Sequence, residues 1–143
     1  MMTTTRKQNS SLRPVEEFRY QIRRFLDFSR RAARAAGLAP QQHQLLLVIA
    51  SGARGPEPSI RELSRRLFLN HNSTVELVNR LERKRLARRV RRPGDRRQVS
   101  VRITPRGRRV LARLTRHHVA ELRSAGPELI RALQAVVKGV GRS

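Results

Sequence analysis

The chain has 143 residues, enough for one domain, and 33 Lys and Arg against 10 Asp and Glu give it a formal net charge of +23. It contains no cysteine, which excludes disulfides and thiolate metal sites, and its apolar runs are too short for a signal peptide or a membrane span. These absences lead us to expect a soluble, cytoplasmic protein. A charge of this size strains a compact monomer by self-repulsion, so we also expect a polyanionic partner.

The N-terminal part of the sequence predicts one long helix after a polar start. Residues 1–13 lack an apolar pattern, and we expect them to form a flexible segment. Pro14 is a favourable first residue of a helix, and two acidic residues follow it. Apolar residues then recur every three or four positions until Gly37, which predicts an amphipathic helix over residues 14–36.

The next segment has the pattern of a helix-turn-helix. A helix is predicted to begin at Pro40, and the composition of residues 52–58 predicts a loop. Ser59 begins the sequence SIRE, a capping box that predicts a short helix. A turn at residues 68–70 leads to another helix, which we expect to end at Arg85. Two short helices joined by a tight turn form the helix-turn-helix motif.

Beyond Leu86 the hydrophobic period changes from 3.6 to 2. Apolar and polar residues alternate over residues 99–103, which predicts a half-buried strand. Residues 87–91 can pair with this strand across a turn at residues 92–95. A hairpin directly after a helix-turn-helix makes a winged helix, so we predict a mainly α fold with a small β-hairpin wing, over residues 40–104.

The remaining chain predicts helices that need a partner. Thr104 is expected to cap a helix over residues 105–124, and a break at residues 126–127 is expected to precede a final helix. The terminal regions, 14–36 and 105–143, carry apolar stripes that a winged helix of about 65 residues cannot cover. We therefore expect them to form a homodimer; the alternative is that they pack on their own subunit. A dimer would place two recognition helices ~34 Å apart on a palindromic DNA site.

The positive charge is concentrated in the middle of the chain. Residues 37–116 contain twenty basic and five acidic residues, for +15 of the total. The free N–H groups at a helix N-terminus bind phosphate. Side chains with two hydrogen-bonding groups, such as arginine, read base edges in the major groove of DNA. We therefore expect double-stranded DNA as the partner. The candidate contacts in the second helix of the motif are Asn70, His71, Asn72, Ser73, Thr74, Glu76, Asn79 and Arg80. Those in the wing are Arg91, Arg92, Asp95, Arg96 and Arg97.

Several of these residues have a simpler structural interpretation. Asn70 or Asn72 can be the N-cap of the helix rather than a DNA contact. Glu76 and Arg80 are four residues apart, so they can form an ordinary surface ion pair instead of contacting bases. Asp95 would be repelled by DNA, and we expect it to orient a neighbouring arginine.

The stretch STVELVNRLERKRLARRVRRPGDRRQVSVRITPRG, residues 73–107, resembles the MarR family of bacterial winged-helix repressors. It is similar to the family's recognition helix followed by a D-x-R wing signature and then L-T-x-x-G. The first signature corresponds to Asp95 and Arg97, and the second to an isoleucine followed by Thr104 and Gly107.

The resemblance implies a single MarR-like domain over residues 14–143 and a homodimer that uses both terminal regions. It also implies that Arg97 enters the minor groove and that Asp95 orients it. Two positions depart from the family pattern. Arg85 stands where the family commonly has glycine, so it must take a left-handed cap or end the helix differently. Glu76 replaces a small hydroxyl residue, which leaves the half-site sequence open.

The family also suggests a small, often phenolic, anionic effector, with these candidate contacts: Tyr20, Arg23, Arg24 and His43. Each has a structural alternative, since Tyr20 suits an interface and a lone histidine is commonly a core residue. His117 and His118 together with His43 could form a zinc site, but no cysteine or suitable carboxylate completes four ligands. We therefore expect no metal and no cofactor.

Four functions compete at this point. The first is a dimeric, sequence-specific repressor of a palindromic operator that a small effector relieves, found on the bacterial nucleoid when bound. The second is a constitutive or architectural DNA-binding protein without an effector. An RNA-binding winged helix is disfavoured by an aromatic content of 3%. An enzyme is the weakest reading, because no nucleophile–base spacing, Gly-rich phosphate loop or carboxylate pair stands out.

Overall fold

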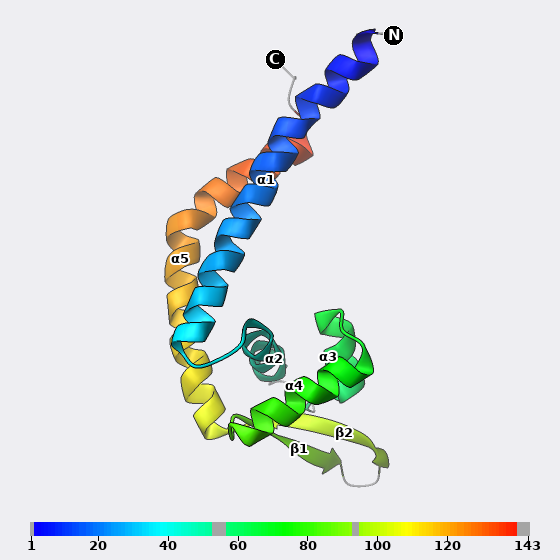
Figure 1. Ribbon diagram of the computed structural model, residues 1–143, viewed down its shortest axis with the longest axis vertical. Helices are drawn as coiled ribbons and strands as arrows, with labels where there is room; N and C mark the ends of the chain where they lie inside the picture. The colour runs from blue at the N-terminus through cyan, green and yellow to red at the C-terminus, as the bar shows by residue number, and fades with distance from the viewer. Residues whose placement is uncertain (1, 53–56, 93–94, 140–143) are drawn as a thin grey trace. The chain divides into compact units, whose positions relative to one another are not determined.

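The computed structural model describes residues 2–52, 57–92 and 95–139, without the side chains of residues 2–9, 92 and 95–98. Figure 1 shows the elements of this part of the chain. In order they are α1 (Met2–Ala35), α2 (Pro40–Ser51), α3 (Ile60–Leu67), α4 (His71–Arg83), β1 (Ala87–Arg92), β2 (Asp95–Ile103) and α5 (Pro105–Lys138). The predicted mainly α fold with a β-hairpin wing is confirmed.

The chain divides into two compact units. One consists of Met1–Arg31 with Arg116–Ser143, and the other is Ala32–Thr115, which contains the winged helix. The second unit is wider than the 40–104 that the sequence predicts. The reason is that Leu38 and Leu111, which flank that range, are buried in the same core.

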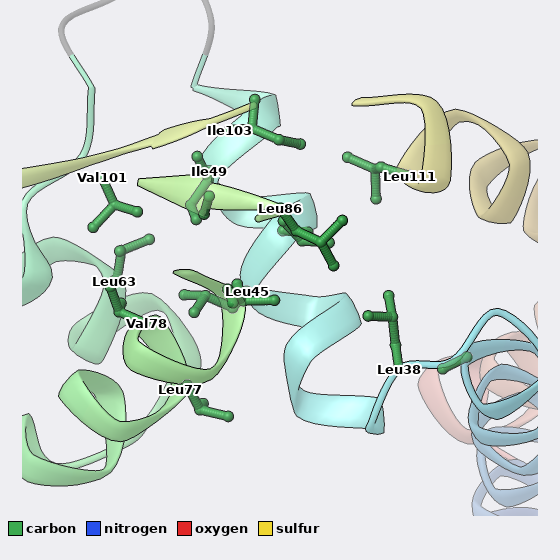
Figure 2. Close-up of a cluster of buried hydrophobic side chains, with 14 of the residues drawn as sticks. Leu38, Leu45, Ile49, Leu63, Leu77, Val78, Leu86, Val101, Ile103 and Leu111 are labelled. Atoms are coloured by element: carbon green, nitrogen blue, oxygen red, sulfur yellow. The ribbon is translucent and has the colours of Figure 1, made fainter. Parts of the chain in front are cut away.

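The core of the winged-helix unit joins its three short helices to one face of the hairpin. Figure 2 shows Val101 of β2 close to Leu63 of α3, with Leu45 of α2 in the same cluster. Leu45, Leu63 and Val101 are fully buried. Burying one such side chain contributes about 1.5–3 kcal/mol, so these contacts hold α2 and α3 against the hairpin, and Leu77, Val78 and Leu81 add α4 to the same core.

The α3 helix begins as the SIRE sequence predicts. The backbone N–H of Glu62 donates to Ser59 Oγ at 3.1 Å, and the Ser59 N–H donates to Glu62 Oε2 at 3.3 Å. This reciprocal pair confirms the capping box. It satisfies two donors that a helix N-terminus otherwise leaves without intrahelical partners.

Three helices end in the same way, although only one of them uses glycine. The residue with the left-handed conformation is Gly37 after α1 (φ 79°), Phe68 after α3 (φ 55°) and Arg85 after α4 (φ 61°). The residue that follows is a leucine each time, and its N–H bonds to the carbonyl five residues back at 2.9–3.0 Å. This is the Schellman arrangement, and it confirms that Arg85 takes the left-handed cap.

The hairpin has the predicted pairing. β1 and β2 are antiparallel, with Ala87 opposite Ile103 and Arg91 opposite Val99. The register shifts between Arg91 and Arg92, which lies opposite Asp95. We call this β1–β2 hairpin the wing.

Gly107 in the first turn of α5 packs directly on the backbone of Leu86, in the segment between α4 and β1. A Cβ at this position would lie 2.2 Å from the Leu86 carbonyl oxygen and 2.8 Å from Ile103 Cγ1. Thr104 caps the helix as predicted, because its Oγ1 accepts the Gly107 N–H at 3.0 Å. Only glycine allows this close approach of two backbones.

Both long helices differ from the prediction at a proline. α1 begins at Met2 instead of Pro14, and α5 runs through Pro127 instead of breaking there. A proline removes one N–H donor, but its fixed φ of about −65° is itself helical, so the backbone can continue on both sides. Figure 1 shows α5 bending in its orange part, and a proline-induced kink is a common cause of such a bend. The predicted start at residue 14 and the predicted break at 126–127 are therefore wrong.

In the first unit, α1 and α5 pack side by side around a histidine. His118 Nε2 lies 2.8 Å from Ser29 Oγ. Its ring also makes edge contacts with Phe25 and Phe28, at centroid distances of 6.0 and 5.4 Å. His118 is therefore a packing residue of this unit.

Candidate nucleic-acid interface

The N-terminus of α4 is capped by Asn70. Its Oδ1 accepts the backbone N–H of Ser73 at 2.7 Å, which decides between the two candidate caps. Asn72 is exposed in the first turn and does not act as the cap. The positive end of the α4 dipole therefore faces solvent with polar side chains around it, an arrangement that binds anions.

The α4 helix separates a buried face from an outward face. Leu77, Val78 and Leu81 are buried in the core of the unit. Six of the eight predicted helix contacts have exposed side chains: Asn70, His71, Asn72, Ser73, Glu76 and Arg80. Their spacing of three and four residues gives one continuous polar surface along the helix.

Glu76 and Arg80 do not pair with each other. The ion pairs among the described side chains do not include one between them. Their charged groups are therefore available to other partners. This is the arrangement expected if Arg80 reads guanine and Glu76 accepts from cytosine.

The interpretation of Thr74 as a DNA contact needs correction. Thr74 is 0% exposed, and its hydroxyl donates to the Asn70 carbonyl oxygen at 2.9 Å. Ser64 of α3 lies 2.8 Å away, oxygen to oxygen. Thr74 therefore joins α4 to α3 inside the unit, because Ser64 gives its hydroxyl a partner away from water.

Asn79 also has a structural partner. It is half-buried, and its Oδ1 accepts a hydrogen bond of 2.7 Å from Arg89 Nη2. Arg89 Nη1 forms an ion pair with Glu82, and the Arg89 backbone N–H lies 3.5 Å from Glu82 Oε2. Sequence reasoning missed this cluster, since residues 7 and 10 apart on different elements give no periodic signal.

The wing is described mainly by its backbone. Arg91 is exposed on β1, as a DNA contact requires. The side chains of Arg92, Asp95, Arg96 and Arg97 lie outside the described residues, and only their strand positions are known. Arg92 stands opposite Asp95 in the register, next to the turn.

The α3 helix carries additional exposed cations. Arg61, Arg65 and Arg66 are exposed, and none of them forms an ion pair with another described side chain. Sequence reasoning did not single them out, because an arginine on a solvated helix face carries no motif. Their charge supplies sequence-independent attraction to a polyanion.

The four effector candidates fall in different units. Tyr20, Arg23 and Arg24 lie on the part of α1 that belongs to the first unit, and His43 is buried in α2 of the winged-helix unit. Arg23 and Arg24 are exposed and lie 3.4 and 3.3 Å from glutamate oxygens. Arg24 lines a hollow of only about 10 Å³ in the first unit, which is space for about one water molecule.

A metal centre has no support among the described side chains. In that part of the chain no group of three His, Cys, Asp or Glu side chains could hold a metal ion. His118 is engaged with Ser29, whereas His117 is exposed.

Among the helices that the structure describes, none is long and apolar enough to cross a membrane.

The first unit presents a large apolar surface. Nine large apolar side chains of this unit are exposed: Leu12, Val15, Tyr20, Leu26, Val119, Leu122, Ile130, Leu133 and Val137. The winged-helix unit exposes only Leu47 and Phe68 among its described large apolar residues. Apolar surface concentrated in this way is typical of a protein–protein interface.

Comparison with known sequences supports a single family. The family model described as MarR family matches residues 36–98. A protein of Thauera aromatica, described as a transcriptional regulatory protein for the hcr operon, is 35% identical over 96 residues. The match covers 67% of this chain and 56% of that protein, so the chain spans little more than half of this relative.

Solved structures share the fold. AbsC, a MarR family transcriptional regulator from Streptomyces coelicolor, has a TM-score of 0.69 at 21% identity, over 83% of each chain. FabT of Streptococcus pneumoniae, crystallised with DNA, has a TM-score of 0.54 at 23% identity, over 73% of this chain and 64% of FabT.

Proposed function

The chain belongs to the MarR family of winged-helix transcriptional regulators, and from that premise we propose that it binds double-stranded DNA as a homodimer. In this proposal it represses transcription from a palindromic operator, and a small anionic effector relieves the repression. The relatives are regulators rather than enzymes, which supports a binding function.

The outward face of α4 is the observation that carries this proposal. It combines a capped, solvent-facing helix N-terminus with the unpaired Glu76 and Arg80 on the same face. Phosphate oxygens would bind near Asn72 and Ser73, whose exposed side chains surround the free N–H groups. Base edges would be read by Glu76 and Arg80, deeper along the helix.

A footprint with a matched pair of variants tests the assignment. Arg80→Ala should weaken operator binding by about tenfold or more, because a bidentate arginine–guanine contact contributes about 1–3 kcal/mol. Arg113→Ala removes the same charge from an exposed position of α5 and should change the affinity by less than about twofold. Equal losses in both variants, or tighter binding to structured RNA than to any duplex, would refute the base-reading role.

We infer that Arg97 enters the minor groove and that Asp95 orients it. The support is the D-x-R signature and its strand position beside the turn of the wing. Arg97→Ala should weaken operator binding and reduce the slope of log K against log salt by about one phosphate contact. An unchanged affinity at two salt concentrations would argue against this role.

Dimerisation through the first unit can be tested with two leucines of equal exposure. Leu133 on α5 and Leu47 on α2 are both 44% exposed, but only Leu133 lies in the apolar surface of the first unit. Leu133→Glu should dissociate the dimer, because it buries a charge in an apolar interface. Leu47→Glu should leave the dimer intact. Light scattering measures both masses, and a monomeric unmodified chain would contradict the proposal.

The proposed effector is a small anion that releases the operator. The candidate contacts are Tyr20, Arg23, Arg24 and His43, on α1 and α2. Titration of the operator complex with salicylate-like anions should release DNA if one of them is an effector. No release by a broad panel of anions would favour constitutive DNA binding.

A further inference from the structure

A pocket of about 360 Å³ lies within the winged-helix unit, and none of the assigned DNA contacts of α4 lines it. It is formed where the turn after α1, the end of α4 and the first turns of α5 come together. A volume of this size is within the range of small-molecule sites in proteins.

The lining of this pocket is strongly cationic. Arg83, Lys84, Arg85 and Arg106 all contribute to it. Among the described residues that line the pocket, none is acidic, so no carboxylate within it offsets four positive charges. Cations gathered in a concave surface concentrate the local potential and attract anions.

Lys84 is held in place by neutral groups. Its Nζ donates to the Gly37 carbonyl oxygen at 2.8 Å and to Gln42 Oε1 at 2.7 Å. These bonds fix the ammonium group without neutralising its charge, and they use two of its three donors. A positioned charge with one donor remaining binds an anion at a smaller entropic cost than a mobile one.

The three arginines approach the pocket from two helix ends. Arg83 and Arg85 come from the end of α4, and Arg106 comes from the first turn of α5, where the helix dipole is positive. All three are exposed, so their planar forks can turn toward a bound group. Arg85 holds a left-handed conformation that glycine adopts more easily. Unlike glycine, however, it adds a cation to the pocket.

We propose that this pocket binds a phosphate group. Arginine forks match phosphate oxygens bidentately, and a phosphate group offers more oxygens to four cations than a monocarboxylate does. The phosphate can belong to a small phosphorylated compound or to the DNA backbone, since both present the same oxygens. The proposal rests on the pocket alone and does not require the assigned base contacts.

Calorimetric titration of the full chain with inorganic phosphate and with pyrophosphate, at constant ionic strength, tests the site. The pocket variant is Arg85→Gln with Arg106→Gln. The control variant is Arg88→Gln with Arg108→Gln, which removes the same charge from two exposed neighbours outside the pocket. Thermal melting of each variant checks that it is folded.

The unmodified chain should bind pyrophosphate saturably and more tightly than salicylate. The pocket variant should bind it at least about tenfold more weakly, and the control should match the unmodified chain. No saturable binding, or equal losses in the two variants, would overturn the proposal.

Repeating the titration with the chain saturated by duplex DNA identifies the source of the phosphate. Competition by DNA, with weaker DNA binding of the pocket variant than of the control, assigns the pocket to the DNA backbone. Unchanged pyrophosphate affinity assigns it to a free phosphorylated compound.

Discussion

Arg89 of the wing holds Asn79 of α4 through a hydrogen bond of 2.7 Å from Nη2 to Oδ1. The same guanidinium forms an ion pair with Glu82, one turn further along α4. One arginine of β1 therefore binds two positions of the helix. This fixes the wing relative to the outward face of α4. In the proposed DNA complex, it sets the distance between the helix in the major groove and the wing in the minor groove.

Arg89→Ala should lower the free energy of unfolding by about 1–2 kcal/mol, because it removes the ion pair with Glu82 and the hydrogen bond to Asn79. The side chains of Arg89 and Glu82 are 31% and 34% exposed, so solvent screening keeps the loss below that of a fully buried pair. Arg88→Ala, at the exposed neighbouring position, should change stability by less than about 0.5 kcal/mol. Urea denaturation measures both, and equal losses would show that the cluster does not stabilise the fold.

Thr74 and Ser73 should separate stability from binding. Thr74→Val keeps the shape of a buried side chain but removes its hydroxyl, and it should cost about 1 kcal/mol of stability. Ser73→Ala leaves the backbone N–H that Asn70 caps, so its stability should not change, while its operator affinity should fall. Thermal melting and DNA titration of both variants measure the two effects. Lower operator affinity with unchanged stability in Thr74→Val would indicate that Thr74 contacts DNA.

Two glycines of α5 should respond to alanine in opposite directions. Gly107→Ala should destabilise the chain by about 1–3 kcal/mol, since its Cβ would lie 2.2 Å from the backbone oxygen of Leu86. A Cβ added at Gly126 would have no other atom within 4 Å. Gly126→Ala should therefore stabilise the helix by about 0.5–1 kcal/mol. Calorimetric melting temperatures that shift in the same direction would contradict this account of the contact.

Phe68→Gly should stabilise the protein although it removes a phenylalanine. Phe68 is 96% exposed, so its ring buries little surface, and its left-handed backbone costs about 1–2 kcal/mol. Phe68→Ala is the control, because it removes the ring and keeps the strain. The glycine variant should be more stable than the alanine variant by about 1 kcal/mol in chemical denaturation. A less stable glycine variant would indicate that the strain is relieved elsewhere.

The winged helix was predictable because its signals are local and mutually consistent. The SIRE capping box and the change of hydrophobic period beyond Leu86 each depend on a few neighbouring residues. The same local rules failed at Pro14 and Pro127. A missing N–H is visible in a sequence, whereas the ability of the surrounding helix to continue past it is not.

The candidate interface was predictable as a face of a helix but not residue by residue. Thr74 and Asn79 are polar, and polarity alone placed them with the exposed residues. Their partners, Ser64 and Arg89, lie ten residues away on other elements, so only the folded chain brings them together. A polar residue is buried when the tertiary structure supplies its hydrogen bonds, which a periodic pattern does not report.

The backbone bonds at the two ends of α4 also affect how the protein can change. Asn70 secures one end of the helix and the Leu86 N–H secures the other, while the apolar face holds the middle. The outward side chains at positions 72, 73, 76 and 80 therefore contribute little to folding. Mutations there can accumulate without unfolding the chain, so a new operator preference can evolve, or be engineered, on an unchanged scaffold.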